Sequence, residues 1–154
     1  MKILVVYDSK YGNTKIVAEN ILEGVKQIEG NESAIFYAKE VESQVLASCD
    51  ALIIGAPNHM ASPSRTMKKF VDKLVELNLK AKSVAVFGTY SGKERVTDRA
   101  VKKMEKILER TLPNLRLIQP SLSVKVKGVT GPVADGELPR CQDFGRRIAN
   151  QLHI

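Results

Sequence analysis

The sequence predicts an α/β fold of three layers, in which an open, doubly wound parallel sheet of five strands lies between helices. Two observations predict it. Five short apolar runs alternate with five helical patterns along the 154 residues, without an internal repeat or a linker. The runs at 3–7 and 51–56 are apolar on both faces, which is typical of parallel strands that helices cover on each side. The length suits one domain with one core.

The chain opens on a strand, a polar loop and a helix. After the strand at 3–7, six polar residues lead into a helical pattern over 14–28. The stripe expected to face the core comprises Ile16, Val17, Ile21, Leu22, Val25 and Ile28. The loop combines Gly12, an amide, a cation and two hydroxyls at a helix N-terminus with unpaired N–H groups, so it is suited to hold a phosphate. An ordinary βα turn with Thr14 as the helix cap explains the same residues.

The middle of the chain adds two strands and two helices. Residues 33–38 alternate weakly, which favours a strand near an edge of the sheet, and a short helix is expected at 40–48. The strand at 51–56 ends in a loop, 57–64, that two prolines bound. The helix predicted at 65–77 buries Met67, Phe70, Val71, Leu74 and Leu77.

The last part repeats the alternation. The strand at 83–87 ends in a loop, 88–92, before a charged helix predicted at 93–112. The inward stripe of that helix comprises Val96, Ala100, Val101 or Met104, Ile107 and Leu108. The final strand is expected at 115–127, where Pro120 indicates a break or an edge position. A loop at 128–139, rich in Gly and Pro, and a closing helix at 140–152 complete the chain.

Three loops are expected to meet at one edge of the sheet. Loops 8–14, 57–64 and 88–92 each follow a strand directly. Parallel strands end at the same edge, and open sheets of this kind bind ligands there. The sequence therefore predicts a binding site built from these three loops.

Composition narrows the class of partner. The formal charge is +7, but the cations are scattered, without a basic run interleaved with aromatics or a zinc-finger spacing, so no nucleic acid is expected. No apolar stretch reaches the roughly 18–20 residues that span a bilayer, and no signal-peptide pattern opens the chain, so we expect a cytoplasmic protein away from the membrane. Cys49 and Cys141 lack metal spacing and are expected to be free thiols that pack as small hydrophobes.

At this point the chain resembles the flavodoxin family. The motifs that carry the resemblance are Ser-Lys-Tyr-Gly-Asn-Thr at 9–14, Gly-Ala-Pro-Asn-His at 55–59 and Phe-Gly-Thr-Tyr-Ser-Gly at 87–92. Ser9, Gly12 and Thr14 match the pattern (S/T)-x-x-G-x-T with which flavodoxins bind the FMN phosphate. Without a visible insertion in the last strand, the chain is similar to short-chain flavodoxins and to the FMN domain of flavodiiron proteins. The resemblance implies strand order 2-1-3-4-5 and one FMN-binding domain over 1–154.

The resemblance also implies the residues of the cofactor site. Those around the phosphate are Ser9, Lys10, Tyr11, Gly12, Asn13 and Thr14. Lys10 is optional among them, because flavodoxin-like sites often hold the phosphate without a cation. Those beside the reactive edge of the flavin are Pro57, Asn58, His59 and Met60, and those on its opposite side are Thr89, Tyr90, Ser91 and Gly92. Tyr90 either stacks on the isoalloxazine or is a surface turn residue. His59 either has no flavin contact or couples a proton to flavin reduction, and Met60 either packs on the flavin or is exposed.

The function implied is an FMN-binding, low-potential electron carrier between redox proteins. No nucleophile–base pair, metal cluster or carboxylate pair stands out, which favours a carrier over an enzyme. The alternatives are a small NAD(P)H- or quinone-dependent oxidoreductase with 128–139 as a modest insertion, a porphyrin-pathway oxidase, and a flavin-free binding module.

The chain departs from familiar flavodoxins in two ways: it has no tryptophan and it is basic. A basic carrier is expected to dock on acidic, ferredoxin-like redox proteins. The cations that could form this surface are Lys68, Lys69, Lys73, Arg95, Arg99, Lys102 and Lys103, although each also suits a solvated helix face. We expect a monomer or a weak homodimer.

Overall fold

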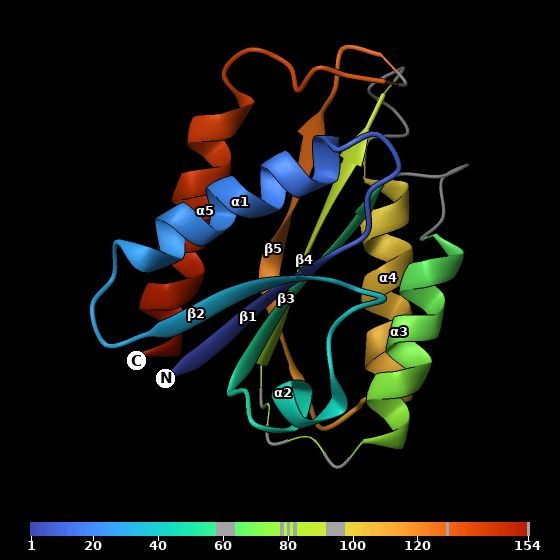
Figure 1. Cartoon of the computed structure of the whole chain (residues 1–154), viewed down its shortest axis with the longest axis vertical. Helices are drawn as coiled ribbons and strands as arrows, with labels where there is room; N and C mark the ends of the chain where they lie inside the picture. The colour runs from blue at the N-terminus through green and yellow to red at the C-terminus, as the bar shows by residue number, and fades with distance from the viewer. Residues whose placement is uncertain are drawn as a thin grey trace.

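The computed structural model describes residues 1–57, 64–77, 79, 81, 83–91, 98–128 and 130–153. Five parallel strands form one sheet in the order β2-β1-β3-β4-β5, which confirms the predicted fold class (Figure 1). The strands are β1 (Lys2–Tyr7), β2 (Glu32–Tyr37), β3 (Ala51–Pro57), β4 (Ser83–Tyr90) and β5 (Arg116–Lys125). The helices are α1 (Asn13–Lys26), α2 (Ser43–Ala47), α3 (Arg65–Glu76), α4 (Arg99–Thr111) and α5 (Glu137–Leu152).

Each face of the sheet carries its own core. Along β1, Ile3 and Val5 join the cluster under α1 and α5, whereas Leu4 and Val6 join the cluster under α2, α3 and α4. All four side chains are fully buried. A strand covered on both faces has no solvent side, which is why its sequence is apolar without alternation. Among the described residues no helix is long and apolar enough to cross a membrane.

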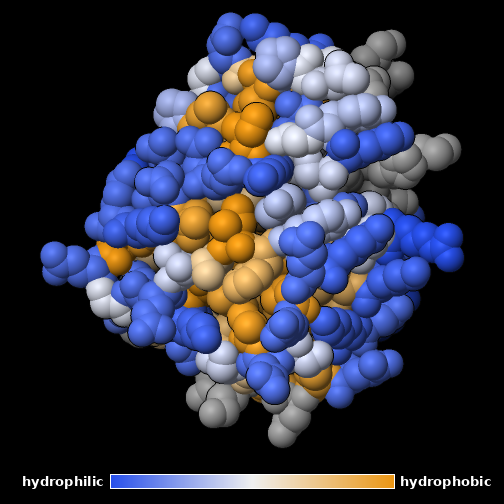
Figure 2. All heavy atoms as spheres, in the orientation of Figure 1, coloured by the Kyte–Doolittle hydropathy of each residue, from blue (hydrophilic) through white to orange (hydrophobic). Residues whose placement is uncertain are grey.

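The edge strand β2 contrasts with the central strands. Residues 33–37 are only half-buried, which agrees with the weak alternation that placed this strand near an edge. Figure 2 shows hydrophobic side chains at the surface around β2, in the middle of the view. The sheet therefore has one regular, partly apolar edge.

Two glycines bring α1 and α5 into backbone contact. A Cβ on Gly24 would lie 2.0 Å from the carbonyl oxygen of Gln142, and one on Gly145 would lie 2.1 Å from that of Ile21. Such distances are far below van der Waals contact, so only glycine fits at either position.

The inward face of α1 also differs from the prediction. Ala18 is buried and Ile16 is 42% exposed, because Ile16 lies about a quarter-turn from the stripe that contacts the sheet.

Among the element boundaries that differ from those predicted, three stand out. The helix expected at 40–48 is limited to 43–47. Strand β4 continues to Tyr90, because Gly88 and Thr89 pair with both neighbouring strands, so residues 88–90 are strand and not loop. Helix α5 begins at Glu137, because Gly136 caps it with φ of 83° and Pro139 lies in the first turn, where no N–H partner is needed. Of the helix expected at 93–112, residues 93–97, including Val96, lie outside the described part of the chain.

Strand β5 is broken where Pro120 predicted it. Ala85 pairs with Ile118 but Phe87 pairs with Leu122, so the residues between them bulge out of the ladder. Arg147 of α5 donates to the carbonyl oxygens of Gln119 and Pro120. The Arg147 side chain therefore holds the break in place where the hydrogen bonds of the β4–β5 ladder are interrupted.

Candidate functional site

The described parts of the three predicted loops meet at the carboxyl edge of the sheet. The Asp8 N–H donates to the carbonyl of Gly55 at 3.0 Å, which ties the first loop to β3. Pro57, the last residue of β3, pairs with Thr89 of β4. The hydroxyls of Thr14 and Thr89 are 3.2 Å apart and form a buried hydrogen bond. The start of α1 and the ends of β3 and β4 therefore form one continuous surface.

The first loop folds around Gly12. This residue caps α1 with φ of 88°, a left-handed conformation that glycine adopts without strain. Its N–H donates to the Ser9 hydroxyl at 2.9 Å, and a Cβ on it would meet no atom within 4 Å. Thr14 is not the cap, contrary to the simple-turn interpretation, because the helix begins at Asn13 and Thr14 lies in its first turn.

The side chains of the loop separate into two groups. Lys10 and Tyr11 are exposed, with the ammonium 5.3 Å from the ring centroid. Asn13 and Thr14 are buried, although both are polar. The first turn of α1 contains no acidic residue, so the partial positive charge of the helix N-terminus is not neutralised from within the helix. Open space above a glycine, hydroxyls and unpaired helix N–H groups make a donor set that fits a phosphate dianion.

The other predicted residues are only partly covered by the structure. Thr89 is 5% exposed, and Tyr90 and Ser91 are half-buried at the end of β4. Asn58, His59, Met60 and Gly92 lie outside the described residues. Their roles, like the stacking of Tyr90, remain predictions.

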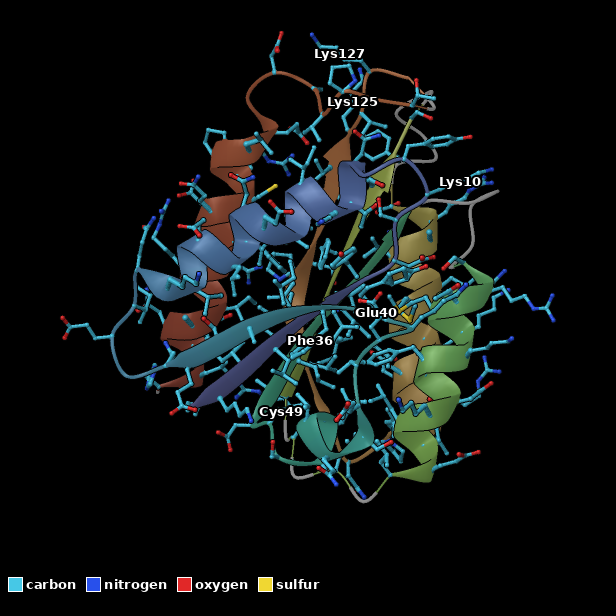
Figure 3. All side chains as sticks on the ribbon, in the orientation of Figure 1. Lys10, Phe36, Glu40, Cys49, Lys125 and Lys127 are labelled. Carbon is cyan, nitrogen blue, oxygen red and sulfur yellow. The ribbon has the colours of Figure 1, made fainter. Side chains whose placement is uncertain are left out.

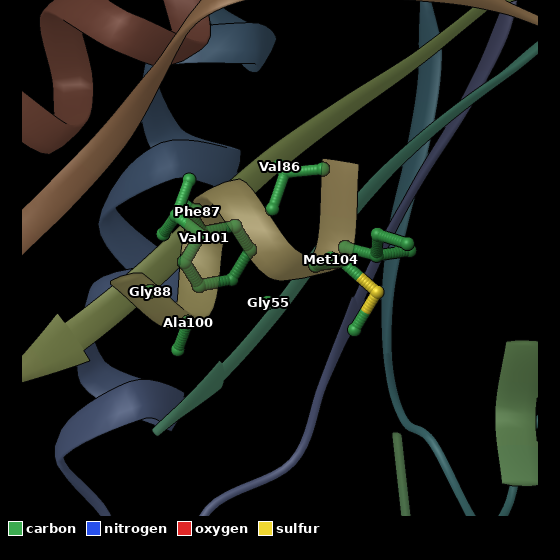
Figure 4. Close-up of a pocket in the computed structure, with 8 residues that line it drawn as sticks. Gly55, Val86, Phe87, Gly88, Ala100, Val101 and Met104 are labelled. Carbon is green, nitrogen blue, oxygen red and sulfur yellow. The ribbon is translucent and has the colours of Figure 1, made fainter. Parts of the chain in front are cut away.

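A small apolar cavity lies beneath this edge, between the sheet and α4 (Figure 4). It is lined by Ile54, Gly55, Val86, Phe87, Gly88, Ala100, Val101 and Met104. The centre of a water-sized sphere can occupy only about 10 Å³ of it, which is room for roughly one water molecule. A ligand larger than water therefore does not fit inside this cavity.

Two features of the site were not predicted from the sequence. The rings of Tyr7 and Tyr37 stack at 5.8 Å where β1 and β2 end, and burial, followed by the nearby Asp8 carboxylate, raises the pKa of Tyr37. Gly131, assigned to a loop, lies against the side chain of Asn13. Both contacts join residues far apart in the chain, and no local motif signals them.

The two cysteines take no part in this edge. Both are buried and free, as predicted. Burial raises the pKa of Cys49 to about 11 and that of Cys141 to about 12. Each is a neutral thiol at neutral pH and packs as a small hydrophobe.

Most of the predicted basic surface lies on α3 and α4. Lys68, Lys69, Arg99, Lys102 and Lys103 are exposed, whereas Arg95 lies outside the described residues. Figure 2 shows hydrophilic side chains gathered over α3, at the right of the view.

A groove between the end of β2 and α3 adds Lys39, a cation that the sequence did not suggest. The groove is lined by Lys39, Lys69 and Lys73, together with Ala38, Thr66 and Phe70. The Lys73 ammonium is partly buried and donates to the carbonyl of Val41 at 2.7 Å. The groove thus combines an aromatic residue and a hydroxyl with three positive charges.

A family model and a curated relative that spans the chain give the same family. A family model described as a flavodoxin domain matches residues 4–125. A flavodoxin of Clostridium saccharobutylicum is 32% identical over 159 aligned residues, which cover 99% of this chain and 98% of the relative.

Solved structures of known proteins share the fold of this chain. A flavodoxin from the domain Archaea superposes with a TM-score of 0.83 at 26% identity, over the whole of both chains. The Flv1 flavodiiron core of Synechocystis sp. PCC6803 gives a TM-score of 0.79 at 18% identity and shares the fold; the match covers 99% of this chain but 36% of that protein.

Proposed function

The chain belongs to the flavodoxin family, the FMN-binding proteins that transfer electrons between redox partners, and from this membership we propose which residues hold the cofactor. Ser9, Gly12, Asn13 and Thr14 bind the FMN phosphate together with the first N–H groups of α1. Thr89, Tyr90 and Ser91 line one side of the flavin, and Pro57 to Met60 line the other. The cation of Lys10 and the ring of Tyr11 lie at the rim.

The observation that carries this assignment is the hydrogen bond between Thr14 and Thr89. It joins the phosphate-type loop to the end of β4, so that one molecule can contact both. The donor set fits a phosphate, because Gly12 leaves open space and the first turn of α1 holds no carboxylate.

Each group has a task that follows from its position. The hydroxyls and N–H groups donate to phosphate oxygens, and charge-assisted hydrogen bonds of this kind are the strong ones. Buried Asn13 and Thr14 are held in place by packing, so they lose little freedom on binding. Bound FMN supplies one- and two-electron redox chemistry, and the protein's part is to hold it and set its surroundings.

We also propose that the redox partners are acidic proteins of ferredoxin-like charge. The formal charge of +7 supports it, and so does the lysine groove, which opens where β2 ends and α3 begins. Opposite charge would steer a partner to this side of the molecule. Residues 1–154 are proposed to form one cytoplasmic domain that is monomeric or weakly dimeric.

The first experiment is a visible absorption spectrum of the purified protein, with FMN titrated into any colourless fraction. We expect flavin bands near ~370 and ~450 nm and release of FMN on denaturation. A colourless protein that ignores added FMN would contradict the proposal. Adding NADH or NADPH to the yellow protein under anaerobic conditions then separates the two activities: a carrier stays oxidised, whereas a reductase bleaches.

A further inference from the structure

From the last residue that the family model matches, Lys125, the chain makes a hairpin at the carboxyl edge of the sheet, over residues 125–128 and 130–134 of the described chain. Val126 and Val133 form an antiparallel bridge. The Lys127 N–H donates to the carbonyl of Pro132 at 2.8 Å, and the Ala134 N–H to that of Lys125 at 2.9 Å. The described residues of the hairpin are therefore joined by its own backbone hydrogen bonds.

The base of the hairpin is fastened to two other elements. Glu137 of α5 accepts from the Lys125 N–H at 2.9 Å, and the same carboxylate pairs with Arg140 at 2.8 Å. On the other side, the Val126 N–H donates to the carbonyl of Tyr90 at 2.8 Å. The hairpin is thus held against α5 and against the end of β4.

The tip of the hairpin contacts the first loop. Gly131 has φ of 92°, and a Cβ on it would lie 2.3 Å from Oδ1 and 2.7 Å from Nδ2 of Asn13. Asn13 is the first residue of α1, follows Gly12 directly and is 9% exposed. Figure 3 shows Lys125 and Lys127 of the hairpin at the same end of the molecule as Lys10 of the loop. The amide side chain of Asn13 is therefore enclosed between its own loop and the hairpin.

We propose that this hairpin holds the phosphate loop in its FMN-binding shape, with Gly131 as the positioning residue that contacts Asn13. The inference rests on the proposed function. Because the hairpin is anchored at its base and touches Asn13 at its tip, it fixes the N-terminus of α1 relative to β4. Those are the two parts of the chain that face the phosphate and the flavin.

The proposal predicts an effect on phosphate recognition and not on flavin recognition. A side chain at position 131 pushes Asn13 away and shifts the N–H groups that follow Gly12. FMN affinity then falls, whereas the affinity for riboflavin, which lacks the phosphate, does not change. General damage to the fold would weaken both ligands alike.

The test compares Gly131→Ala with Gly136→Ala by fluorescence titration of the apoproteins with FMN and with riboflavin. Gly136 is the matched control, because its φ is 83° but a Cβ there would meet no atom within 4 Å. Relative to that control, we expect Gly131→Ala to raise the Kd for FMN about tenfold or more and to leave the Kd for riboflavin within about twofold. In the background of Asn13→Ala, which removes the atoms that the new Cβ meets, Gly131→Ala should raise the Kd for FMN no more than Gly136→Ala does.

The outcomes separate the two proposals. If wild-type protein binds no FMN, the proposed function fails and this inference fails with it. If wild type binds FMN but Gly131→Ala behaves like Gly136→Ala, weakens both ligands equally or keeps its effect without the Asn13 amide, only the positioning role is wrong. Should Gly131→Ala not fold, the double variant Asn13→Ala with Gly131→Ala decides. An affinity for FMN equal to that of Asn13→Ala supports the contact, and failure of the double variant to bind FMN overturns it.

Discussion

At the scale of single residues, Thr14 links the packing of the domain to its site. The methyl-bearing side chain is 1% exposed, yet its hydroxyl bonds to Thr89 on a different element. A buried hydroxyl needs a partner, and Thr89 supplies it. In the proposed site, Thr14 therefore presents to the phosphate a hydroxyl that is already oriented.

Replacing Thr14 by Val tests this role with almost no change of shape. We expect FMN binding to weaken by about 1.5–3 kcal/mol, the usual worth of a hydrogen bond to a charged group. Titration calorimetry or flavin fluorescence measures it, and Thr14→Ser should retain most of the affinity because it keeps the hydroxyl. Thr111→Val is the control, since that hydroxyl donates to Ile107 within α4. Equal FMN affinity in all three variants would remove Thr14 from the phosphate site.

At the scale of elements, α1 and α5 are in backbone contact. The two glycines lie on opposite helices, and each faces a backbone carbonyl of the other helix. Because glycine has no side chain, the two helices pack backbone against backbone at these positions. This contact fixes α1, which begins directly after Gly12, against α5.

Gly145→Ala should therefore destabilise the domain although it replaces glycine by a better helix former. We expect a loss of about 1–3 kcal/mol in the free energy of unfolding from overpacking. Urea denaturation of the apoprotein measures it. Gly128→Ala is the control, because the nearest atom to its Cβ would be 3.9 Å away. Equal stability in both variants would mean that the helices can separate without cost.

Helices and strands were more predictable from sequence than their ends. Apolar runs and helical periodicity located all five strands and the central part of each helix, because burial on two faces leaves a local pattern. The end of β4 was missed because pairing with Ser123 and Val124, distant in sequence, outweighs the turn signal of Gly88. The polar loop that leads into α1 could be predicted from the sequence, and its binding of a phosphate stays a prediction. The Gly131–Asn13 contact could not be predicted, because it depends on how two loops meet.

At the scale of the whole molecule, we expect charge to steer the approach of a partner. Lys39, Lys69 and Lys73 share one groove between the end of β2 and α3, and in the proposed docking a charge there acts on both encounter and binding. Lys26 lies at the other end of α1 from the first loop and pairs with Glu23, which makes it a cation of similar exposure in a different place.

Lys69→Glu should slow electron transfer from the reduced protein to an acidic ferredoxin, and Lys26→Glu should have a smaller effect. At low salt we expect the second-order rate constant to fall about threefold to tenfold for Lys69→Glu. Stopped-flow absorbance at increasing ionic strength measures it, and the difference from wild type should shrink as salt screens the charges. Equal rates for the two variants would place the docking surface elsewhere.

The break in β5 bears on self-association. An edge strand presents unpaired carbonyl and N–H groups that can recruit a strand from another chain. Here the carbonyls of Gln119 and Pro120 already accept from Arg147, and the Gln119 amide and the Ser121 hydroxyl donate to Glu105. A strand approaching β5 meets an irregular ladder at 119–121, where two carbonyl acceptors are already occupied. The break therefore disfavours edge-to-edge pairing through this part of β5, and β2 is left as the regular edge of the sheet.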